Sequence, residues 1–223
     1  MEPLAHPHRP SLESEQRRVR DLVLEMGEMV DVAIHRATRA LVDRDVELAG
    51  AVIAGDHVVN ARQAEVHEHC LSVILTQAPV ARDLREILGF LHMSDELERM
   101  ADHCVNIARI ARNLSDLPPL GAPVDLPILS RTVAEQVRDM LNALVARDVD
   151  RAREIAARDD RVDRIYHRMV DDILHLMVGD SRNVYPGTQL ILVSMNLERI
   201  ADRVTNLAED LVFLETGAVE ELG

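Results

Sequence analysis

Apolar residues recur along this chain with the period of an α-helix. Between Leu12 and Asp43 they form one stripe at steps of three and four residues: Leu22, Met26, Met29, Ala33, Ala37 and Ala40. Between Val46 and Thr76 the apolar positions keep a seven-residue step: Val52, Val59, Val66 and Val73. This step is typical of the seam along which helices of a bundle pack. After a turn at Pro79, a third helix is predicted from Val80 to Leu114.

The second half of the chain repeats this pattern. Three more helices are predicted, over residues 128–146, from there to about 178, and over 188–215. The seam of the fifth helix lies 103 residues after that of the second: Ile155, Val162, Met169 and Leu176. The dipeptide Arg44-Asp45 also returns, as Arg147-Asp148, with the same offset. The pattern therefore predicts an all-α protein built as a tandem repeat of a three-helix unit.

Two segments fall outside the repeats. Residues 115–127 contain four prolines and a glycine, which exclude a regular element and predict a linker between residues 12–114 and residues 128–217. Residues 1–11 contain three prolines and are expected to form a disordered tail. Because aromatic residues make up only 2% of the chain and tryptophan is absent, the core must be aliphatic.

The formal net charge of −14 narrows the possible partners. It argues against nucleic acid, which requires a basic surface, and against anionic membranes. It suits metal cations or a basic patch on another protein. No apolar run is long enough to span a bilayer, and residues 1–10 lack the apolar core of a signal peptide, so we expect a soluble cytoplasmic protein.

One acidic motif occurs once in each repeat. The sequence Leu97-Glu98-Arg99-Met100-Ala101-Asp102 is followed by Asn106, and it returns 100 residues later as Leu197-Glu198-Arg199-Ile200-Ala201-Asp202, followed by Asn206. In each copy the Glu, the Asp and the Asn lie four residues apart, so they share one face of a helix. Two carboxylates at this spacing repel each other, which a solvated surface tolerates and a bound cation would relieve.

The preceding helix of each repeat offers a complement to this motif. Asp56 and Asn60 lie on the second helix, and Asp159 and Asp163 lie 103 residues later on the fifth. If the two helices are neighbours, oxygen ligands from both could converge on a hard metal cation. From the residues alone, a metal site and a solvated acidic face are both open interpretations.

Other kinds of site are poorly supported. His67, His69 and Cys70 resemble zinc ligands in linear order, but helical spacing puts only His67 on the face of Asp56 and Asn60. A di-iron carboxylate oxidoreductase would need Glu-x-x-His on two helices, and this chain has none. No nucleophile–base pair can be argued from spacing. The two open hypotheses are a metal-binding regulator and a helical adaptor without functional metal sites.

The paired acidic motifs, the Leu-Glu-Arg-x-Ala-Asp cores, the six-helix tandem repeat and the Arg-Asp dipeptides resemble the PhoU family of bacterial phosphate-signalling accessory proteins. The resemblance implies two three-helix bundles side by side with pseudo-two-fold symmetry, a homodimer and no catalysis. It implies metal ions in multinuclear sites, with iron or zinc as first candidates and manganese or magnesium as others. The implied ligands are Asp56, Glu98 and Asp102 in the first half and Asp159, Asp163, Glu198 and Asp202 in the second, with Asn106 and Asn206 beside them.

The resemblance also implies a role and partners. Members of the family restrain the sensor histidine kinase of the phosphate system and contact the phosphate ABC transporter, for which the ATPase subunit is the expected partner. They do this while phosphate is plentiful, and they reach the membrane only through these partners. Asn60 departs from the acidic pattern of the family, because it brings no charge to the first-half site.

Overall fold

The computed structural model describes residues 11–118, 120 and 125–223. Within these ranges the chain is helical and contains no strand: α1 (Leu12–Asp43), α2 (Val46–Gln77), α3 (Arg82–Leu114), α4 (Leu126–Ala146), α5 (Val149–Ala156), α6 (Asp159–Gly179), the short 3₁₀ helix η1 (Ser181–Asn183) and α7 (Val184–Thr216). The predicted all-α class is confirmed. The expected N-terminal tail lies almost entirely outside the described residues, and the linker lies partly outside them.

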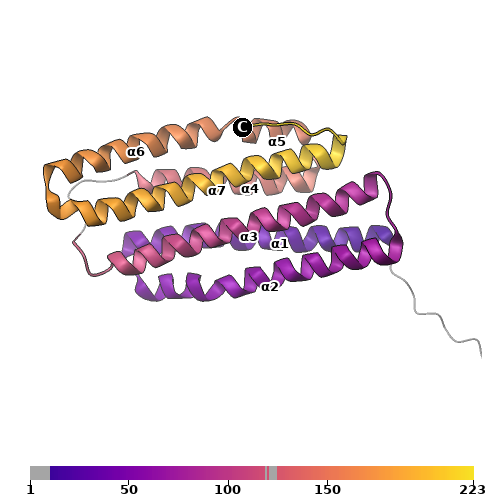
Figure 1. The fold of residues 1–223 in the computed structure, drawn as a ribbon, viewed down its shortest axis with the longest axis horizontal. Coiled ribbons are helices and arrows are strands. Elements are labelled where there is room, and N and C mark those ends of the chain that lie inside the picture. Colours follow the sequence, from indigo (N-terminus) through magenta and orange to yellow (C-terminus); the bar gives the residue numbers. More distant parts are fainter. Residues whose placement is uncertain (1–10, 119, 121–124) are drawn as a thin grey trace, which may run out of the picture.

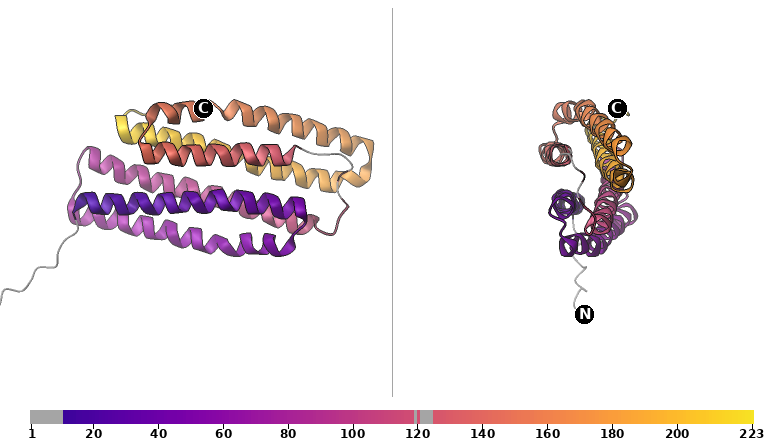
Figure 2. Two further views of the ribbon diagram at one scale, coloured as in Figure 1. Left: turned by 180° about the vertical axis from the view of Figure 1, so that it is seen from behind. Right: turned by 90° about the vertical axis from the view of Figure 1, so that its left-hand side faces the viewer.

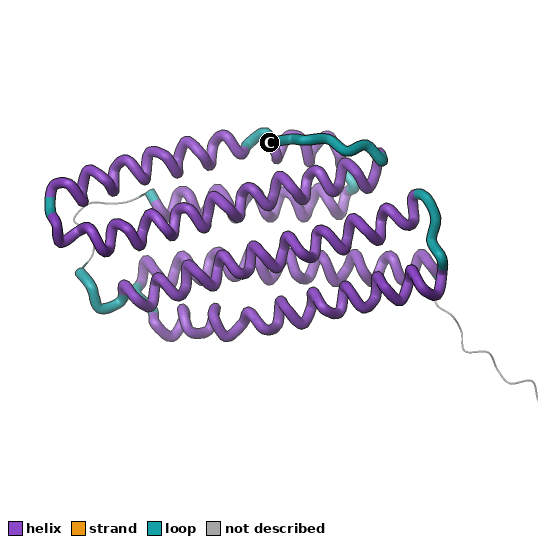
Figure 3. The backbone as a smooth tube through the Cα atoms, in the orientation of Figure 1, coloured by secondary structure: helices purple, strands orange, loops and turns teal. Residues whose placement is uncertain are grey.

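The helices form two antiparallel bundles that lie side by side (Figures 1 and 3). The first contains α1, α2 and α3, and the second contains α4, α7 and the pair α5 and α6. The main contact between the bundles is α3 against α7, supplemented by α1 against α4. In the end-on view of Figure 2, α1 and α4 lie inside a curved row formed by the other helices. This arrangement gives the pseudo-two-fold symmetry that was predicted.

The repeated Arg-Asp dipeptide makes the turn between the first two helices of each repeat. Arg44 and Arg147 adopt the left-handed conformation, with φ of 56° and 53°, and end α1 and α4. The next residue, Asp45 or Asp148, caps the following helix by accepting a hydrogen bond from a backbone N–H three residues on, at 2.8 and 2.9 Å. A two-residue connection of this kind fixes the two helices as antiparallel neighbours.

The predicted fifth helix is interrupted, which corrects the expectation of one continuous element. α5 ends at Ala156 and α6 begins at Asp159. The N–H of Arg158 donates to the carbonyl of Ile155, and the N–H of Arg161 donates to the carbonyl of Arg158. At both places the hydrogen bond spans three residues and not the four of an α-helix. The side chain of Arg158 leaves the helix and donates to Asp139 of α4 at 2.5 Å.

Two other helix ends differ from the prediction. α4 begins at Leu126, two residues early, with Pro127 in its first turn. α7 begins at Val184, four residues before its predicted start at residue 188, so Pro186 and Gly187 lie within the helix. Proline is tolerated in both places because the first-turn N–H groups of a helix have no intrahelical acceptor.

The predicted seams form the core. Val52, Val59, Val66 and Val73 of α2 are all buried, as are Ile155, Val162 and Met169 in the second half. The fourth predicted member of the second seam, Leu176, is only half-buried near the end of α6. Large aliphatic side chains and one phenylalanine, Phe90, fill the interior. None of the helices in the described ranges is both long and apolar enough to cross a membrane.

Candidate functional site

The second-half acids lie where α6 packs against α7. Asp159 and Asp163 come from α6, Glu198 and Asp202 come from α7, and all four are half-buried. Burial, reinforced by the charges of Asp163 and Asp202, raises the pKa of Asp159 to about 6. Burial, followed by the charges of Asp202 and Asp163, raises the pKa of Glu198 to about 7. The pKa values of Asp159 and Glu198 therefore depend on carboxylates of both α6 and α7.

The first-half acids lie at the equivalent place between α2 and α3, but this group has one carboxylate fewer. Burial and the charges of Asp102 and Asp56 raise the pKa of Glu98. Asp56 and Glu98 are half-buried, whereas Asp102 and Asn60 are exposed. The side-chain amide of Asn60 donates to Asp56 Oδ2 at 3.2 Å, so in this half an internal hydrogen bond takes the place of one carboxylate.

Each acidic group contains one buried carboxylate oxygen that has no hydrogen-bond partner among the described residues. Asp56 Oδ1 and Asp159 Oδ1 are both buried atoms without a hydrogen-bond donor, and they occupy matching positions in the two repeats. A buried carboxylate oxygen without a donor is unfavourable, and a cation would satisfy it. The oxygen donors present thus fit a hard metal ion. In the parts of the chain that the structure describes, however, no three histidine, cysteine or acidic side chains are already grouped as a metal-binding cluster.

The two asparagines of the motif make other contacts. Asn206 Nδ2 donates to Glu96 Oε2 at 2.8 Å, across the contact between α7 and α3. Asn106 Oδ1 accepts a hydrogen bond from Arg109 at 3.3 Å on its own helix. Neither contact involves the acidic groups, so the structure brings together the acids of the predicted sets and leaves the two asparagines apart from them.

The contact between α3 and α7 contains polar residues that the sequence reasoning missed. Glu96 is 1% exposed and accepts from Arg99 at 2.7 Å, from Arg203 at 3.3 Å and from Asn206. At the matching position, Asn196 Oδ1 lies 2.9 Å from His103 Nδ1. The 100-residue offset pairs position 96 with 196 and position 103 with 203, so the two contacts are equivalent, but only the packing of α3 against α7 reveals them.

The histidines considered for zinc have other partners. His67 Nε2 lies 2.9 Å from Asp95 Oδ1, and the same oxygen accepts from Gln63. His69 lies beside Glu15 and Arg18 of α1. Burial of the Cys70 thiol raises its pKa to about 12, which makes it a poor ligand as well as a poor nucleophile.

The surroundings of the two acidic groups also differ. Beside Asp56, an apolar cavity of about 210 Å³ opens between α1, α2 and α3, and Gly55, Val58 and Arg36 are among its lining residues. In the second half, the residues that match Gly55 and Arg36 are Arg158 and Asp139, and their ion pair at 2.5 Å bridges α6 to α4 at the matching place. The interruption before Asp159 is thus coupled to a bridge that the first half lacks.

Comparisons with known proteins agree with this architecture. The family model described as "PhoU domain" matches residues 23–111 and 126–211, one match in each repeat. The "Phosphate-specific transport system accessory protein PhoU homolog" of Zymomonas mobilis is 35% identical over 89% of this chain and 84% of its own length. The protein of the same name from Aquifex aeolicus is 34% identical over 92% of this chain and 93% of its own length.

Two solved structures show the same fold. The crystal structure of PhoU from Pseudomonas aeruginosa superimposes with a TM-score of 0.89 at 29% identity, covering 93% of this chain and 100% of that one. The crystal structure of the phosphate transport system regulatory protein PhoU from Streptococcus pneumoniae superimposes with a TM-score of 0.87 at 28% identity. It covers 95% of this chain and 100% of that one. The likeness thus extends over both repeats.

Proposed function

Because this chain belongs to the PhoU family, we propose that it is a metal-binding regulator, not an enzyme, that controls phosphate uptake and phosphate-starvation signalling. It acts from the cytoplasm through contacts with the sensor histidine kinase and the ATPase subunit of the phosphate ABC transporter. The names of its relatives as phosphate-specific transport accessory proteins support the phosphate role. The matched acidic groups support the metal role.

The observation that carries metal binding is the pair of matching buried oxygens, Asp56 Oδ1 and Asp159 Oδ1, which have no donor. Each lies near a glutamate whose pKa is raised by burial and then by the charges of neighbouring carboxylates, Glu98 in one half and Glu198 in the other. A divalent cation would satisfy the free oxygen and remove the repulsion together. Iron, zinc, manganese and magnesium all accept carboxylate ligands, and several carboxylates on two helices allow more than one ion per site.

Two matching apolar pairs support protein contacts. Leu71 and Leu75 are 57% and 74% exposed near the end of α2, and the matching residues of α6, Leu174 and Val178, are 44% and 90% exposed. In each pair the side chains lie four residues apart on one helical face. An exposed apolar pair repeated at equivalent positions suits docking on a protein partner better than solvation.

Metal content separates this proposal from a helical adaptor without metal sites. Elemental analysis of protein purified without an affinity tag should show bound metal in the wild type and much less in Glu198→Ala/Asp202→Ala. The matched control is Asp171→Ala/Asp172→Ala, which removes two exposed acids from α6 without touching the acidic group. Equal metal in all three proteins, or none in any, would favour the adaptor.

The regulatory role is tested in cells. Deletion of the gene should derepress phosphate-starvation genes when phosphate is plentiful, and the wild-type chain should restore repression. Leu75→Ser/Val178→Ser should fail to restore it while keeping its helical signal and its metal. Val219→Ser, at a residue that is 87% exposed outside the helices, is the control that should restore repression fully. If deletion leaves starvation genes and phosphate uptake unchanged, the phosphate role is wrong.

A further inference from the structure

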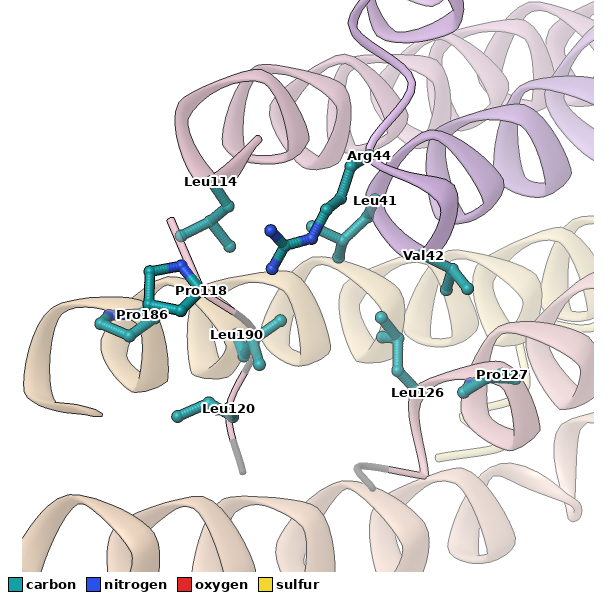
Figure 4. A pocket seen from close by; sticks show the side chains of 10 residues that line it. All are labelled: Leu41, Val42, Arg44, Leu114, Pro118, Leu120, Leu126, Pro127, Pro186 and Leu190. Carbon is teal, nitrogen blue, oxygen red and sulfur yellow. The ribbon is translucent and has the colours of Figure 1, made fainter. Parts of the chain in front are cut away.

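A second apolar cavity lies at one end of the molecule, away from both acidic groups. It has a volume of about 250 Å³ and is bounded by the end of α1, the end of α3 and the starts of α4 and α7 (Figure 4). Among the described residues, ten line this cavity and nine of these are apolar: Leu41, Val42, Leu114, Pro118, Leu120, Leu126, Pro127, Pro186 and Leu190. The tenth is Arg44, whose guanidinium points into the cavity.

The matching arginine in the second half shows what Arg44 lacks. Arg147 donates to Glu86 of α3 and, at 2.8 Å, to Glu215 of α7. By the 100-residue offset, Glu86 corresponds to Pro186, and Glu215 corresponds to Ser115. Arg44 therefore has a proline and a serine at the places where Arg147 has two glutamates. Arg44 Nη1 accordingly lies 3.5 Å from the backbone carbonyl of Ser115, and it forms no ion pair among the described residues. Residues 119 and 121–124 contain no acidic side chain that could supply one.

Arg44 is held at this place by the backbone. Its left-handed conformation ends α1, and its N–H donates to the carbonyl of Ala40. The same geometry holds Arg147, so the two guanidinium groups are presented alike and differ only in their surroundings. A guanidinium favours the bidentate binding of a carboxylate, and Arg147 finds two such groups within the chain, one on α3 and one on α7.

We propose that the cavity around Arg44 binds an organic monocarboxylate with a short apolar chain, whose carboxylate takes the place that Glu86 and Glu215 occupy around Arg147. The volume equals that of about eight water molecules, which suits a chain of roughly eight carbons. The apolar lining would bury the chain, and the single cation selects a monoanion over a phosphate dianion. This site is independent of the metal sites and of the phosphate role.

The test is a calorimetric titration of the full-length protein with octanoate, with octanamide as the neutral probe of equal size. We expect octanoate to bind and octanamide to bind at least about tenfold more weakly, because the neutral amide cannot form the bidentate, charge-assisted pairing of a carboxylate with a guanidinium. Arg44→Gln should weaken octanoate by a similar factor. In nuclear magnetic resonance spectra, the methyl signals of Leu41, Leu126 and Leu190 should shift with octanoate in the wild type.

The decisive variant supplies the missing carboxylate from within the chain. Pro186→Glu restores the residue type found at Glu86 and should block octanoate, whereas Pro186→Gln, of nearly the same size, should leave the affinity within about threefold. Ser115→Glu, which matches Glu215, is a second way to block the site if Pro186→Glu disturbs the start of α7.

Three results would overturn the proposal. Octanoate could fail to bind the wild type, or it could bind Arg44→Gln as tightly as the wild type. It could also bind the Glu and Gln variants of Pro186 equally while both keep the wild-type melting temperature. Sedimentation at several concentrations completes the test: if Arg44→Gln changes the oligomeric state and octanoate does not bind, the cavity is an interface between copies of the chain.

Discussion

His103 Nδ1 lies 2.9 Å from Asn196 Oδ1, at the place in one half of the molecule where Arg203 meets Glu96 in the other. Both contacts join α3 to α7, and the pseudo-two-fold axis exchanges them. One is an ion pair between a buried carboxylate and a half-buried guanidinium, and the other is a hydrogen bond between a histidine and an amide. Burial lowers the pKa of His103, and the charges of Arg199 and Arg203 lower it further, although the hydrogen bond with Asn196 opposes this.

Alanine substitutions at the two acceptors should have unequal costs. Glu96→Ala leaves Arg203 without its buried acceptor, and it should lower the free energy of unfolding by about 3 kcal/mol. Asn196→Ala removes weaker bonds, to His103 and to the carbonyl of Leu192, and should cost about 1 kcal/mol. Urea denaturation monitored by circular dichroism gives both values. Equal losses would mean that Arg203 finds another acceptor in the variant.

The metal-free protein should lose stability as the pH rises through the weakly acidic range. The folded pKa values of Asp159 and Glu198, about 6 and about 7, lie above their ordinary values of 3.8 and 4.5. Between the ordinary and the raised pKa values, the folded state binds more protons than the unfolded state. The free energy of unfolding therefore falls as the pH rises from about 4 to about 7. Thermal melts in chelator at pH 5 and pH 8 measure the effect.

Two variants test the origin of this pH dependence. Asp159→Asn/Glu198→Gln should raise the melting temperature at pH 8 and flatten the dependence, since the amides carry no charge. Asp171→Asn/Asp172→Asn, on the exposed part of α6, should leave the slope unchanged. A steep dependence that survives in the first variant would place the titration elsewhere, for example at Asp210, whose pKa burial raises to about 6.

The second-half site should fill before the first when metal is added to stripped protein. It offers four half-buried carboxylates, whereas the first half offers three, and Asp102 among them is exposed. Fewer charges mean weaker attraction for a hard cation, and we expect a difference of about tenfold or more. Asn60→Asp should narrow that gap, and it also removes the hydrogen bond from Asn60 to Asp56. Simultaneous filling in a competition titration would contradict this order.

Two glycines in the first bundle should respond oppositely to alanine. A Cβ at Gly55 meets nothing within 4 Å, so Gly55→Ala should raise the free energy of unfolding by about 0.5–1 kcal/mol through better helix propensity. A Cβ at Gly27 would overlap the methyl groups of Leu141 where α1 meets α4, and Gly27→Ala should cost about 1–3 kcal/mol. Denaturant midpoints measured side by side would decide. A destabilised Gly55→Ala would show that the cavity beside Asp56 requires the smaller residue.

The sequence was sufficient for the helices, the seams and the grouping of acids, because each depends on spacing within one helix or on the repeat offset. The apolar step of seven residues places Val59 and Val162 in the core without knowledge of what covers them. The offsets of 103 and 100 residues then bring Asp159 and Glu198 to the same place as Asp56 and Glu98. Local periodicity and internal repetition are the strongest signals that a single sequence contains.

The missed features depend on contacts between helices. Ala157 and Arg158 have good helix propensity, and only the bond from Arg158 to Asp139 on α4 shows why the helix is interrupted there. Pro186 predicts a turn by composition, although the first turn of a helix accepts proline. Asn206 shares a helical face with the acids in the sequence, yet it binds Glu96 on α3. No spacing within one helix could have identified that partner.

The packing of α3 against α7 has a consequence for how such a chain could arise. A chain of one repeat would expose the face of its third helix, and two copies could cover it by pairing around a true two-fold axis. The tandem chain is the covalent form of that dimer. Once the copies are fused, the two sides of the axis can mutate separately, which a symmetric dimer forbids. The differences between Glu96 and Asn196, and between Pro186 and Glu86, are of the kind that only a fused chain can keep.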